Sequence, residues 1–418
     1  MSIFHDMLQV EERKNFVQRL LDRYGDQDLE TNQTIEYILS PELDSDVNRI
    51  LSDDYWISIP QRKEVKKWNT TKKRIVFILP AREKYFLKFL TFCLKKYDNR
   101  FCDSLYSFRS TQNMNDAIIR IKKEIDHNTQ AVFITDISSF APGLNVDILL
   151  EKLRRFDLKD SILFAFLERL LSRGEYYWEN ELLHGSTGSF PGSSVSAFLM
   201  NVYLEDLDRE MRDRGVTFYR YVDDMLVAAK SEESRDQIGK FLTDKLESFD
   251  LTVNYQKTQW RAPGENWTFL GFEFSKDGGV DISNRTIAKI KGRFRRYARR
   301  LRKKIEEEKI TSEEAMRIFI NRVNRAMFWD GRRHTSFALR CFPLITKLDR
   351  LKDLDSFVQN YIRYLPTGRF TKKNYAVRYD LLKDLGYKSV VGEYYRYREG
   401  IAIYGHEGNA PFGETQKH

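Results

Sequence analysis

Two adjacent carboxylates, Asp223 and Asp224, are the residues of this sequence whose type and spacing best suit chemistry. They lie in residues 218–228 (FYRYVDDMLVA), where apolar and β-branched residues run up to the pair and resume directly after it. This pattern predicts two short strands joined by a tight hairpin, with both aspartates at the turn. Because aspartate is common in turns, a solvated surface turn fits the same pattern. The chemical interpretation therefore depends on a further carboxylate nearby.

Asp136 is the best candidate for that carboxylate. It follows a β-branched stretch at residues 131–135 (AVFIT), which predicts a strand ending at Asp136. Transfer of a phosphoryl group to a polynucleotide end needs two divalent metal ions about 3.5–4 Å apart, held by carboxylates on rigid strands. A strand beside the hairpin would let Asp136 complete such a set. The three aspartates therefore predict a site for two Mg²⁺ ions, with Mn²⁺ as an alternative.

The surrounding segments follow the order expected of a polymerase palm, an α+β sheet backed by helices. A Gly/Ser-rich loop and a helix of small residues stand between Asp136 and the hairpin, where they could face the incoming nucleotide and template base. The expected elements are a helical segment at 1–68, strands at 75–79 and 131–135, helices at 84–97, 113–125, from Asn145 and at 161–171, the loop at 185–194, helices at 195–204 and 233–249, and strands at 252–255 and 268–274.

Composition favours a protein that binds a polyanion. The 418 residues carry 70 Lys and Arg against 61 Asp and Glu, a net charge of +9, and nucleic acid is the commonest polyanionic partner. The three cysteines and six histidines are scattered, which suggests a reducing compartment without a disulfide framework and argues against a zinc site. The first residues lack the features of a signal peptide, and no apolar run approaches the roughly 20 residues that cross a bilayer. We expect a cytoplasmic protein without membrane association.

A basic helix is predicted at residues 285–304, after a change of composition near residue 280. Eleven residues of this segment are basic and none is acidic, while Ile287, Phe294 and Leu301 repeat every seven residues. A solvated helix would fit, but so many like charges repel unless an anion neutralises them, which favours nucleic-acid backbone. The expected contacts are Lys291, Arg295, Arg299 and Arg302.

The C-terminal segment interleaves aromatic and basic residues. Nine of the 22 tyrosines lie between residues 361 and 404, among arginines and lysines. They could stack on unpaired bases, or they could be core residues. The sequence leaves both interpretations open.

These motifs, in this order, resemble those of reverse transcriptases of the bacterial, group II intron-like lineage. Residues 221–224 (YVDD) match the family's Tyr-x-Asp-Asp motif, and residues 133–140 match the strand that bears its first aspartate. Residues 188–204 resemble the loop and helix before the hairpin, residues 251–258 the motif after it, and residues 269–272 the primer grip. Residues 74–80 and 106–109 resemble fingers motifs, so the likeness spans about 65–300.

The resemblance implies a right-hand polymerase fold with fingers, an antiparallel palm sheet backed by helices, and a helical thumb. The implied domains are an N-terminal helical extension with fingers at 1–135, a palm at 136–280 with fingers–palm helices at about 150–185, and a thumb with a Tyr-rich and basic C-terminal segment at 281–418. The implied activity is RNA-directed DNA synthesis from dNTPs, a nucleotidyl transfer, on an RNA template that yields cDNA.

The resemblance also assigns roles to single residues. Asp136 and Asp223 would bridge both Mg²⁺ ions, with Asp224 beside them, Ile137 as a neighbouring metal position, and Lys257 as the general acid for the leaving pyrophosphate. A solvated lysine is the plainer interpretation of Lys257. The other implied contacts are Lys73, Arg74, Phe140, Ala141, Pro191 and Gly192 with the nucleotide, and Arg109, Phe269, Leu270 and Gly271 with nucleic acid. For Arg74, a surface charge at a strand edge fits equally well.

Two positions depart from the family's pattern. Phe190, Pro191 and Gly192 stand where the family has Pro-Gln-Gly, so the glutamine is missing. Five residues after the first aspartate, the family has a bulky aromatic that excludes the ribose 2′-hydroxyl, whereas this chain has Ala141. Either Phe140 takes that role, or discrimination against ribonucleotides is relaxed.

Missing features narrow the biological context. The sequence has no HNH-like His/Cys cluster and no room for an RNase H or integrase domain, and residues 390–392 (VVG) only approximate a retron signature. The chain looks like the stand-alone, defence-associated reverse transcriptases of bacteria, which copy a noncoding RNA and protect against phage. The alternatives are an intron-type maturase that mainly binds RNA, a retron reverse transcriptase and a template-independent terminal polymerase. A tyrosine of the C-terminal segment could act as a protein primer.

Overall fold

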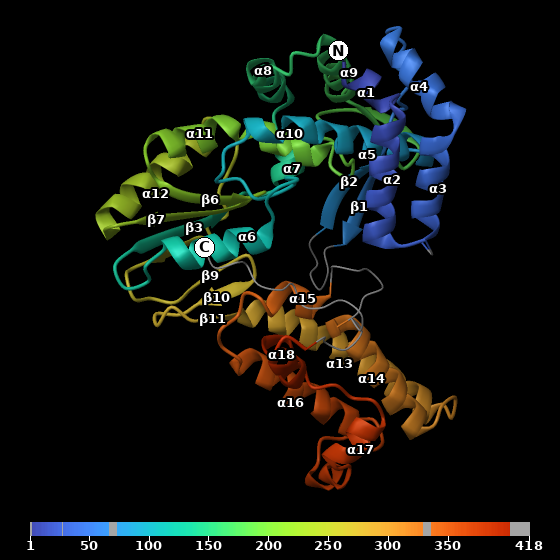
Figure 1. Ribbon diagram of the computed structural model, residues 1–418, viewed down its shortest axis with the longest axis vertical. Coiled ribbons are helices and arrows are strands. Elements are labelled where there is room, and N and C mark those ends of the chain that lie inside the picture. The colour runs from blue at the N-terminus through green and yellow to red at the C-terminus, as the bar shows by residue number, and fades with distance from the viewer. Residues whose placement is uncertain (1, 27, 67–72, 329–335, 402–418) are drawn as a thin grey trace. The chain divides into compact units, whose positions relative to one another are not determined.

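The computed structural model describes residues 2–26, 28–66, 73–328 and 336–401. Its internal contacts divide the chain into two compact units: Met1–Leu21 with Gly25–Gly264, and Glu265–His418 with Asp22–Tyr24. Figure 1 shows the elements of each unit. The division into fingers, palm and thumb at residues 135 and 280 is a different one, and it stays a prediction.

The first unit begins with four helices: α1 (Ile3–Met7), α2 (Val10–Tyr24), α3 (Leu29–Leu39) and α4 (Pro41–Leu51). Phe4 of α1 anchors them, because its buried ring lies against Phe86 of α5 (Ala81–Cys93) and Phe166 of α9 (Ser161–Ser172), with centroids 6.3 and 5.4 Å away. The N–H of Ile3 donates to the Asp160 carboxylate at 2.7 Å. The N-terminal helices are therefore part of the core of this unit.

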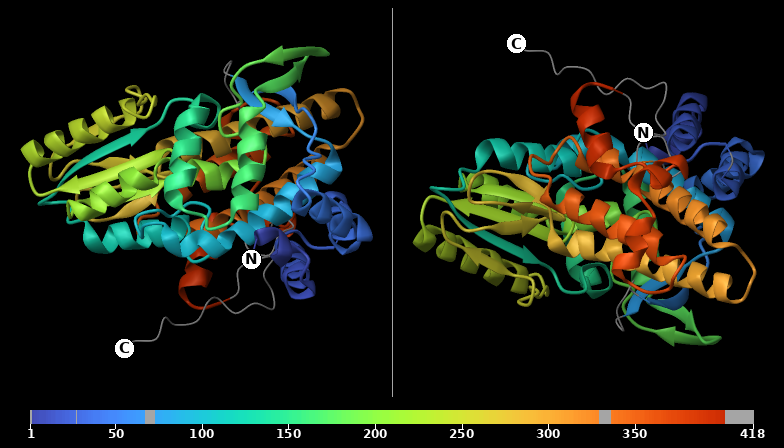
Figure 2. Two further views of the ribbon diagram at one scale, coloured as in Figure 1. Left: turned by 90° about the horizontal axis from the view of Figure 1, so that it is seen from above. Right: turned by 90° about the horizontal axis from the view of Figure 1, so that it is seen from below.

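A four-stranded sheet follows in the order β2-β1-β4-β5. Its strands are β1 (Gln61–Lys66), β2 (Lys73–Ile78), β4 (Glu175–Trp178) and β5 (Glu181–His184). In Figure 2 the hairpin of β4 and β5, coloured green, extends outward at one end of the sheet. The helical prediction for residues 1–68 is wrong for β1, because pairing from Gln61↔Ile78 to Lys66↔Lys73 overrides a weak local pattern. Residues 67–72, between β1 and β2, lie outside the described residues.

A second four-stranded sheet, entirely antiparallel, has the order β6-β7-β3-β8. Its strands are β3 (Ala131–Asp136), β6 (Thr217–Tyr221), β7 (Asp224–Ala229) and β8 (Gln259–Arg261). All six residues of β3 are buried, as a strand covered on both faces requires. Helix α12 (Glu232–Glu247) packs closely on one face, because Gly239 leaves room for Trp260 and Phe133: a Cβ there would lie 2.5 Å from the Trp260 ring. The strand predicted at 252–255 is wrong, since Val253 makes only an isolated bridge with Ile137.

The remaining helices of this unit connect the two sheets. They are η1 (Leu94–Arg100), α6 (Met114–Glu124), α7 (Phe140–Gly143), α8 (Val146–Phe156), α10 (Ser196–Tyr203) and α11 (Glu205–Asp213). The Asn145 side chain caps α8 by accepting from the N–H groups of Asp147 and Ile148, as the sequence predicts. Helix α10 is buried over most of its length and packs against α8.

The second unit combines a three-stranded antiparallel sheet, in the order β11-β10-β9, with helices. Its elements are β9 (Trp267–Phe269), β10 (Phe272–Phe274), β11 (Val280–Ile282), α13 (Asn284–Glu306), α14 (Ser312–Phe328), α15 (Phe337–Cys341), α16 (Asp349–Tyr364), η2 (Lys372–Ala376), α17 (Tyr379–Asp384) and α18 (Val390–Arg398). The predicted seven-residue repeat is confirmed: Ile287, Phe294 and Leu301 are buried in α13, which packs against α14 and α16. Among the described residues, no helix has the length and apolar character that crossing a membrane requires.

Candidate active site

The hairpin of β6 and β7 is closed by only two residues, Val222 and Asp223. Tyr221 pairs with Asp224 in the sheet register, so Asp224 is the first residue of β7 rather than part of the turn, contrary to the sequence prediction. Val222 has φ +60°, in the left-handed region that a β-branched residue rarely adopts. Such a conformation costs about 1–3 kcal/mol and persists only where surrounding contacts impose it.

Buried polar side chains impose this turn. The N–H of Val222 donates to the Ser107 hydroxyl at 2.9 Å, and the carbonyl of Val222 accepts from the Arg220 guanidinium at 3.3 Å. Asn201 in turn donates to the Ser107 carbonyl at 3.1 Å. Both backbone groups of the strained residue are therefore held by side chains, which fixes the direction in which Asp223 leaves the turn.

Arg220 is itself held by a buried carboxylate. Its guanidinium donates to both oxygens of Asp208, at 2.7 and 2.5 Å, and both side chains are fully buried. A bidentate pair of this kind fixes orientation as well as charge. Sequence analysis assigned no role to Ser107, Asn201, Asp208 or Arg220. One signal was present: an arginine within an otherwise apolar strand must find a buried partner.

The central strand brings the third aspartate to the turn. In the pairing of β3 with β7, Asp136 stands opposite Asp224, and the N–H of Ile137 donates to the Asp223 carbonyl at 3.2 Å. Each of the three aspartates offers a carboxylate oxygen, and these oxygens lie within 4.8 Å of one another. Asp136 is buried and the other two are half-buried. The structure thus gathers the three aspartates that the sequence singles out.

The electrostatics of this aspartate trio suit a divalent cation. Burial and the neighbouring Asp136 carboxylate raise the pKa of Asp223, and the Lys257 ammonium partly offsets this. Carboxylate oxygens are the ligands that Mg²⁺ and Mn²⁺ prefer, and a bound cation would relieve the repulsion within the trio. The residues present therefore fit a divalent metal site, without specifying the ion.

Lys257 lies at the edge of the trio. Its ammonium is 2.7 Å from Asp136 Oδ2, and its side chain is 41% exposed. Asn254 also donates to this carboxylate, at 3.2 Å, and its backbone N–H donates to the Asp136 carbonyl at 2.7 Å. The loop of residues 254–257 therefore orients Asp136 and leaves an ammonium beside it that solvent can reach.

Phe140 and Ala141, the two positions considered for excluding the ribose 2′-hydroxyl, differ sharply in exposure. Phe140 is only 4% exposed and packs edge-on against Tyr203, so its ring belongs to the core. Ala141 is half-buried, and its carbonyl accepts from the N–H and the hydroxyl of Ser189, at 2.9 and 3.0 Å. If Phe140 were to exclude the ribose 2′-hydroxyl, its ring would have to leave the core. The alternative that the sequence left open is relaxed discrimination against ribonucleotides.

The Gly/Ser-rich loop is fitted closely between α7 and β2. Gly188 has φ +56°, and a Cβ there would lie 2.5 Å from the Ala141 carbonyl oxygen and 2.8 Å from that of Pro142. Further along, the Pro191 carbonyl accepts from the N–H of Phe77 at 2.7 Å. Gly192, at φ +101°, approaches the same strand. Pro191 and Gly192 are thus joined to the strand that carries Lys73 and Arg74.

The predicted nucleotide-binding cations lie at the start of β2. Lys73 and Arg74 are both exposed, and Lys73 forms an ion pair with Glu64 on β1 at 2.7 Å. Because an exposed pair of this kind contributes about 0–1 kcal/mol, Lys73 is readily released for another anion. Their contact with a nucleotide stays a prediction.

Comparison with known proteins decides the family. A family model described as "Reverse transcriptase (RNA-dependent DNA polymerase)" matches residues 62–274, just over half of the chain. The chain belongs to the reverse transcriptase family. The α+β fold expected from the sequence is confirmed, with the sheet β6-β7-β3-β8 as the palm of a right-hand polymerase. Members of this family are nucleotidyltransferases.

Solved telomerase structures show weak similarity to this reverse transcriptase. Apo telomerase from Candida tropicalis, truncated from the C-terminal domain, has 14% identity and a TM-score of 0.42, over 56% of this chain and 59% of that one. Telomerase from Candida albicans, in complex with a TWJ fragment of telomeric RNA, has 12% identity and a TM-score of 0.43, over 86% of this chain and 70% of that one. The same complex from C. tropicalis has 11% identity and a TM-score of 0.44, over 88% of this chain and 71% of that one. The curated proteins searched contain no match. The reverse transcriptase thus spans less than two thirds of the first of these telomerases.

Arg109, a predicted nucleic-acid contact, serves the fold of the first unit. Its guanidinium is half-buried, donates to the carbonyls of Cys102 and Leu105 at 3.0 and 3.4 Å, and lies over the ring of Phe101. The neighbouring Phe108 has φ +56° and is 53% exposed. Arg109 therefore shapes the loop that carries Ser107, and a contact with nucleic acid stays a prediction.

In the second unit, the predicted primer grip is a hairpin turn rather than part of one strand. Leu270 (φ +49°) and Gly271 (φ +88°) form a two-residue turn between β9 and β10, so the single strand predicted at 268–274 is wrong. Two successive residues with positive φ are the mark of a type I′ turn. Phe269 is buried, and the Gly271 carbonyl accepts from the N–H of Ser283 at 2.9 Å.

The four predicted cations of α13 divide into two kinds. Lys291 forms an ion pair with Asp353 at 2.6 Å, and Arg302 donates to the carbonyls of Leu365 and Pro366, so both hold α13 to neighbouring segments of the second unit. Arg295 and Arg299 are exposed. The Arg295 guanidinium also lies 6.0 Å from the centroid of the Phe357 ring.

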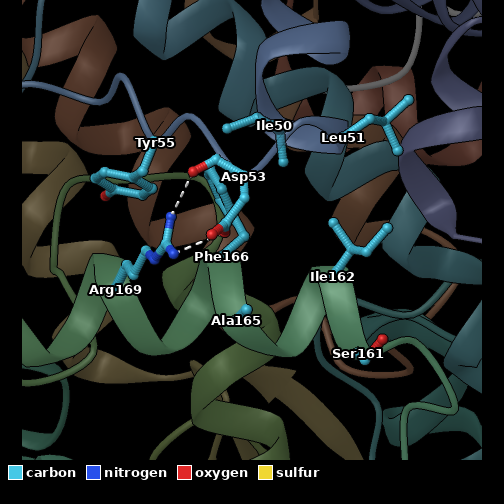
Figure 3. A pocket seen from close by; sticks show the side chains of 9 residues that line it. All are labelled: Ile50, Leu51, Asp53, Tyr55, Ser161, Ile162, Ala165, Phe166 and Arg169. Carbon is cyan, nitrogen blue, oxygen red and sulfur yellow. Dashed lines mark hydrogen bonds and ion pairs between the residues drawn. The ribbon is translucent and has the colours of Figure 1, made fainter.

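A cavity of about 250 Å³ lies in the first unit, between the end of α4 and α9. Figure 3 shows its apolar wall, which includes Ile50, Ile162 and Phe166, and the ion pair of Asp53 with Arg169 (2.6 Å) across it. None of the predicted site residues lines it. The ion pair of Asp53 with Arg169 joins the end of the N-terminal helices to α9, so this region has a structural role.

Replacing Arg220 by Met should destabilise the first unit by about 3–5 kcal/mol, because Asp208 would remain buried without a partner. The double variant Arg220→Met/Asp208→Leu should recover most of that loss, since neither charge remains. Polymerase activity should stay low in both variants, because the Val222 carbonyl loses its donor. Urea unfolding and primer extension measure the two effects. Equal stability of the single and double variants would contradict the role of the ion pair.

Replacing Gly188 by Ala should destabilise the loop by about 1–3 kcal/mol, since the new methyl group would meet the Ala141 and Pro142 carbonyls at a positive φ. The matched control is Gly143→Ala in α7, where a Cβ would meet nothing within 4 Å. Thermal unfolding should separate the two variants by several degrees. Indistinguishable melting temperatures would show that the loop adapts.

Proposed function

We propose that this protein is an RNA-directed DNA polymerase that copies a structured noncoding RNA into cDNA from dNTPs. The observation that carries the proposal is the convergence of three aspartates, Asp136 and Asp224 on the paired strands β3 and β7 and Asp223 in the adjoining turn, with oxygens within 4.8 Å. Rigid carboxylates in this arrangement suit a pair of metal ions. The fingers at 1–135, palm at 136–280 and thumb at 281–418 form part of the same proposal.

In the proposed mechanism, Asp136 and Asp223 would hold two Mg²⁺ ions, with Asp224 and Ile137 beside them. Bound Mg²⁺ would stabilise the charge that develops on the transferred phosphoryl group. Lys257, whose ammonium is 2.7 Å from Asp136 and exposed to solvent, donates a proton to the leaving pyrophosphate. Lys73 and Arg74 bind the triphosphate, and the loop of Pro191 and Gly192 borders the nucleotide. Contacts of Arg109, of the turn at 269–271 and of α13 with nucleic acid complete the proposal.

We further propose that the cDNA serves antiphage defence in the bacterial cytoplasm. The support is the resemblance to defence-associated reverse transcriptases, together with the loop that lacks the family's glutamine. All three cysteines are buried and unpaired, which suits a reducing compartment. Expression of the protein with the RNA that co-purifies with it should reduce phage plaques. Equal protection by a variant with Asp223 and Asp224 replaced by Ala would disconnect defence from DNA synthesis.

The substrate class of the proposed polymerase includes ribonucleotides. Phe140, whose ring is buried against Tyr203, is held away from the role of gate, and Ala141 is too small to exclude a 2′-hydroxyl. Discrimination between dNTPs and rNTPs therefore rests on the remaining contacts, which supports relaxed selectivity.

Replacing Asp223 and Asp224 by Ala should reduce primer extension on an RNA template at least about a thousandfold, because loss of metal ligands removes several kcal/mol of transition-state stabilisation. Asp213→Ala, which removes a mostly exposed carboxylate at the end of α11, is the matched control and should leave activity unchanged. Sequencing of the products should show complements of the template. Homopolymer or random tracts would instead support a terminal polymerase, and equal activity of the double variant would refute the proposed site.

Replacing Ala141 by Tyr should raise the preference for dNTPs over rNTPs by about tenfold or more, because a bulky ring would meet the 2′-hydroxyl. The ratio of kcat/KM for dGTP and rGTP on the same primer and template measures this preference. Ala141→Ser, which adds a single atom, is the control and should stay near the wild-type ratio. A strong preference for dNTPs in the wild type would show that another residue excludes the ribose.

A further inference from the structure

A loop of the second unit, residues 369–379, presents aromatic rings to solvent. It lies between α16 and α17 (Figure 1). Phe370 is 61% exposed and Tyr375 is 62% exposed, whereas Tyr361 and Tyr394 of the same unit are buried. The structure therefore separates the C-terminal aromatic residues into core residues and exposed ones, which the sequence could not do. Exposed aromatic rings placed together often mark an interaction site.

Buried polar side chains hold the 369–379 loop in one shape. Asn374 is 6% exposed, and its amide donates to the Arg369 carbonyl at 2.5 Å. Its side-chain oxygen accepts from the hydroxyls of Thr367 and Thr371, at 3.0 and 3.1 Å. Arg363, 8% exposed, donates to the Val377 carbonyl at 2.9 Å. The exposure of the rings is thus a property of an ordered loop.

Each exposed ring is supported by a side chain from α16. Phe370 stacks on Tyr364 with centroids 4.9 Å apart and planes 20° apart, and Tyr361 meets its ring edge-on. The Arg363 guanidinium lies 5.3 Å from the Tyr375 centroid. A ring fixed in this way loses little conformational freedom when a planar partner stacks on it.

The charge along the chain at these rings is mainly positive. Residues 356–379 contain no acidic residue, and the basic residues of the loop are all exposed: Arg369, Lys372, Lys373 and Arg378. Asp355, just before this stretch, is engaged with Tyr387, Ser389 and the backbone at the start of α18. Asp380, directly after the loop, forms an ion pair with Lys383 at 3.3 Å, so the loop combines flat apolar faces with exposed positive charge.

We propose that the 369–379 loop is a binding site for an unpaired nucleic-acid strand. Bases stack on Phe370 and Tyr375, and phosphates pair with the surrounding lysines and arginines. Rings reach base faces only where the bases are unpaired, so the ligand is a single strand or the single-stranded part of a folded RNA. This inference rests on the proposed function, for which it names a second contact with the template RNA, outside the aspartate trio and the predicted contacts of α13.

Photo-crosslinking tests the site directly. Full-length protein is irradiated with a single-stranded RNA that carries 4-thiouridine, and the crosslinked peptides are identified by mass spectrometry. The proposal expects crosslinks to Phe370 or Tyr375, and their loss in the variant Phe370→Ala/Tyr375→Ala. A single-stranded DNA with 4-thiothymidine forms a second arm and distinguishes template RNA from cDNA as the ligand. Crosslinks confined to other peptides in both arms would overturn the proposal.

Equilibrium binding gives a second measure. The double alanine variant should bind the RNA about 10- to 100-fold more weakly, whereas Phe370→Tyr should bind like the wild type. Tyr395→Ala, which removes another tyrosine with a similar exposure of 53%, is the matched control. Replacing Lys372 and Lys373 by Gln should flatten the slope of log affinity against log salt by about 1.4, the release of two counterions from a single strand. An unchanged affinity in the double alanine variant would contradict stacking.

The result is separable from the proposed catalytic function. Primer extension on a short primer–template duplex with only a brief unpaired overhang scores the aspartate trio, and crosslinking to a free single strand scores the loop. The Asp223→Ala/Asp224→Ala protein should keep the crosslink while losing extension. The Phe370→Ala/Tyr375→Ala protein should keep extension on the short template while losing the crosslink. Loss of both properties in the latter variant would assign the loop a structural role instead.

Discussion

The antiparallel register of β3 and β7 is the constraint on which the rest of the site depends. It sets Asp136 opposite Asp224, and the turn that precedes β7 places Asp223 beside both. A shift of one residue would move every side chain of β3 to the other face of the sheet. The register is secured because all six residues of β3 are buried and because α12 packs closely over Gly239. The hydrophobic core therefore determines the position of three charged groups.

Two groups of charged side chains lie at this end of the sheet, near the turn between β6 and β7. Beneath it, Arg220 and Asp208 neutralise one another in the core, and the arginine also holds the carbonyl of the strained Val222. At the aspartate trio, the Lys257 ammonium lies 2.7 Å from Asp136, and burial together with the neighbouring Asp136 carboxylate raises the pKa of Asp223. The buried pair gives rigidity, whereas the close approach of three carboxylates makes a site that fits a divalent metal ion. A family that transfers nucleotides requires both.

The second unit shows that a basic residue and a nucleic-acid contact are not the same thing. Lys291 forms an ion pair with Asp353, and Arg302 donates hydrogen bonds to backbone carbonyls; both interactions fix α13 against its neighbours. Arg295, Arg299 and the cations of the 369–379 loop stay exposed. Buried polar groups such as Asn374 fix the backbone from which those cations project. In this unit, buried polar side chains with hydrogen-bond partners fix the backbone. The exposed lysines and arginines on that backbone give the surface its positive charge.

The sequence by itself determined what depends on local pattern: the three aspartates, the hairpin, the seven-residue repeat of α13 and the order of motifs that matches the reverse transcriptases. Tertiary structure alone decided which partner each residue meets. It turned residues 61–66 into a strand, made Leu270 and Gly271 a turn, gave Arg220 its carboxylate, buried Phe140 and left Phe370 exposed. Periodicity records which face of an element is apolar, but not which distant element covers it. For that reason the chemistry could be read from the chain, and the fit around the substrate could not.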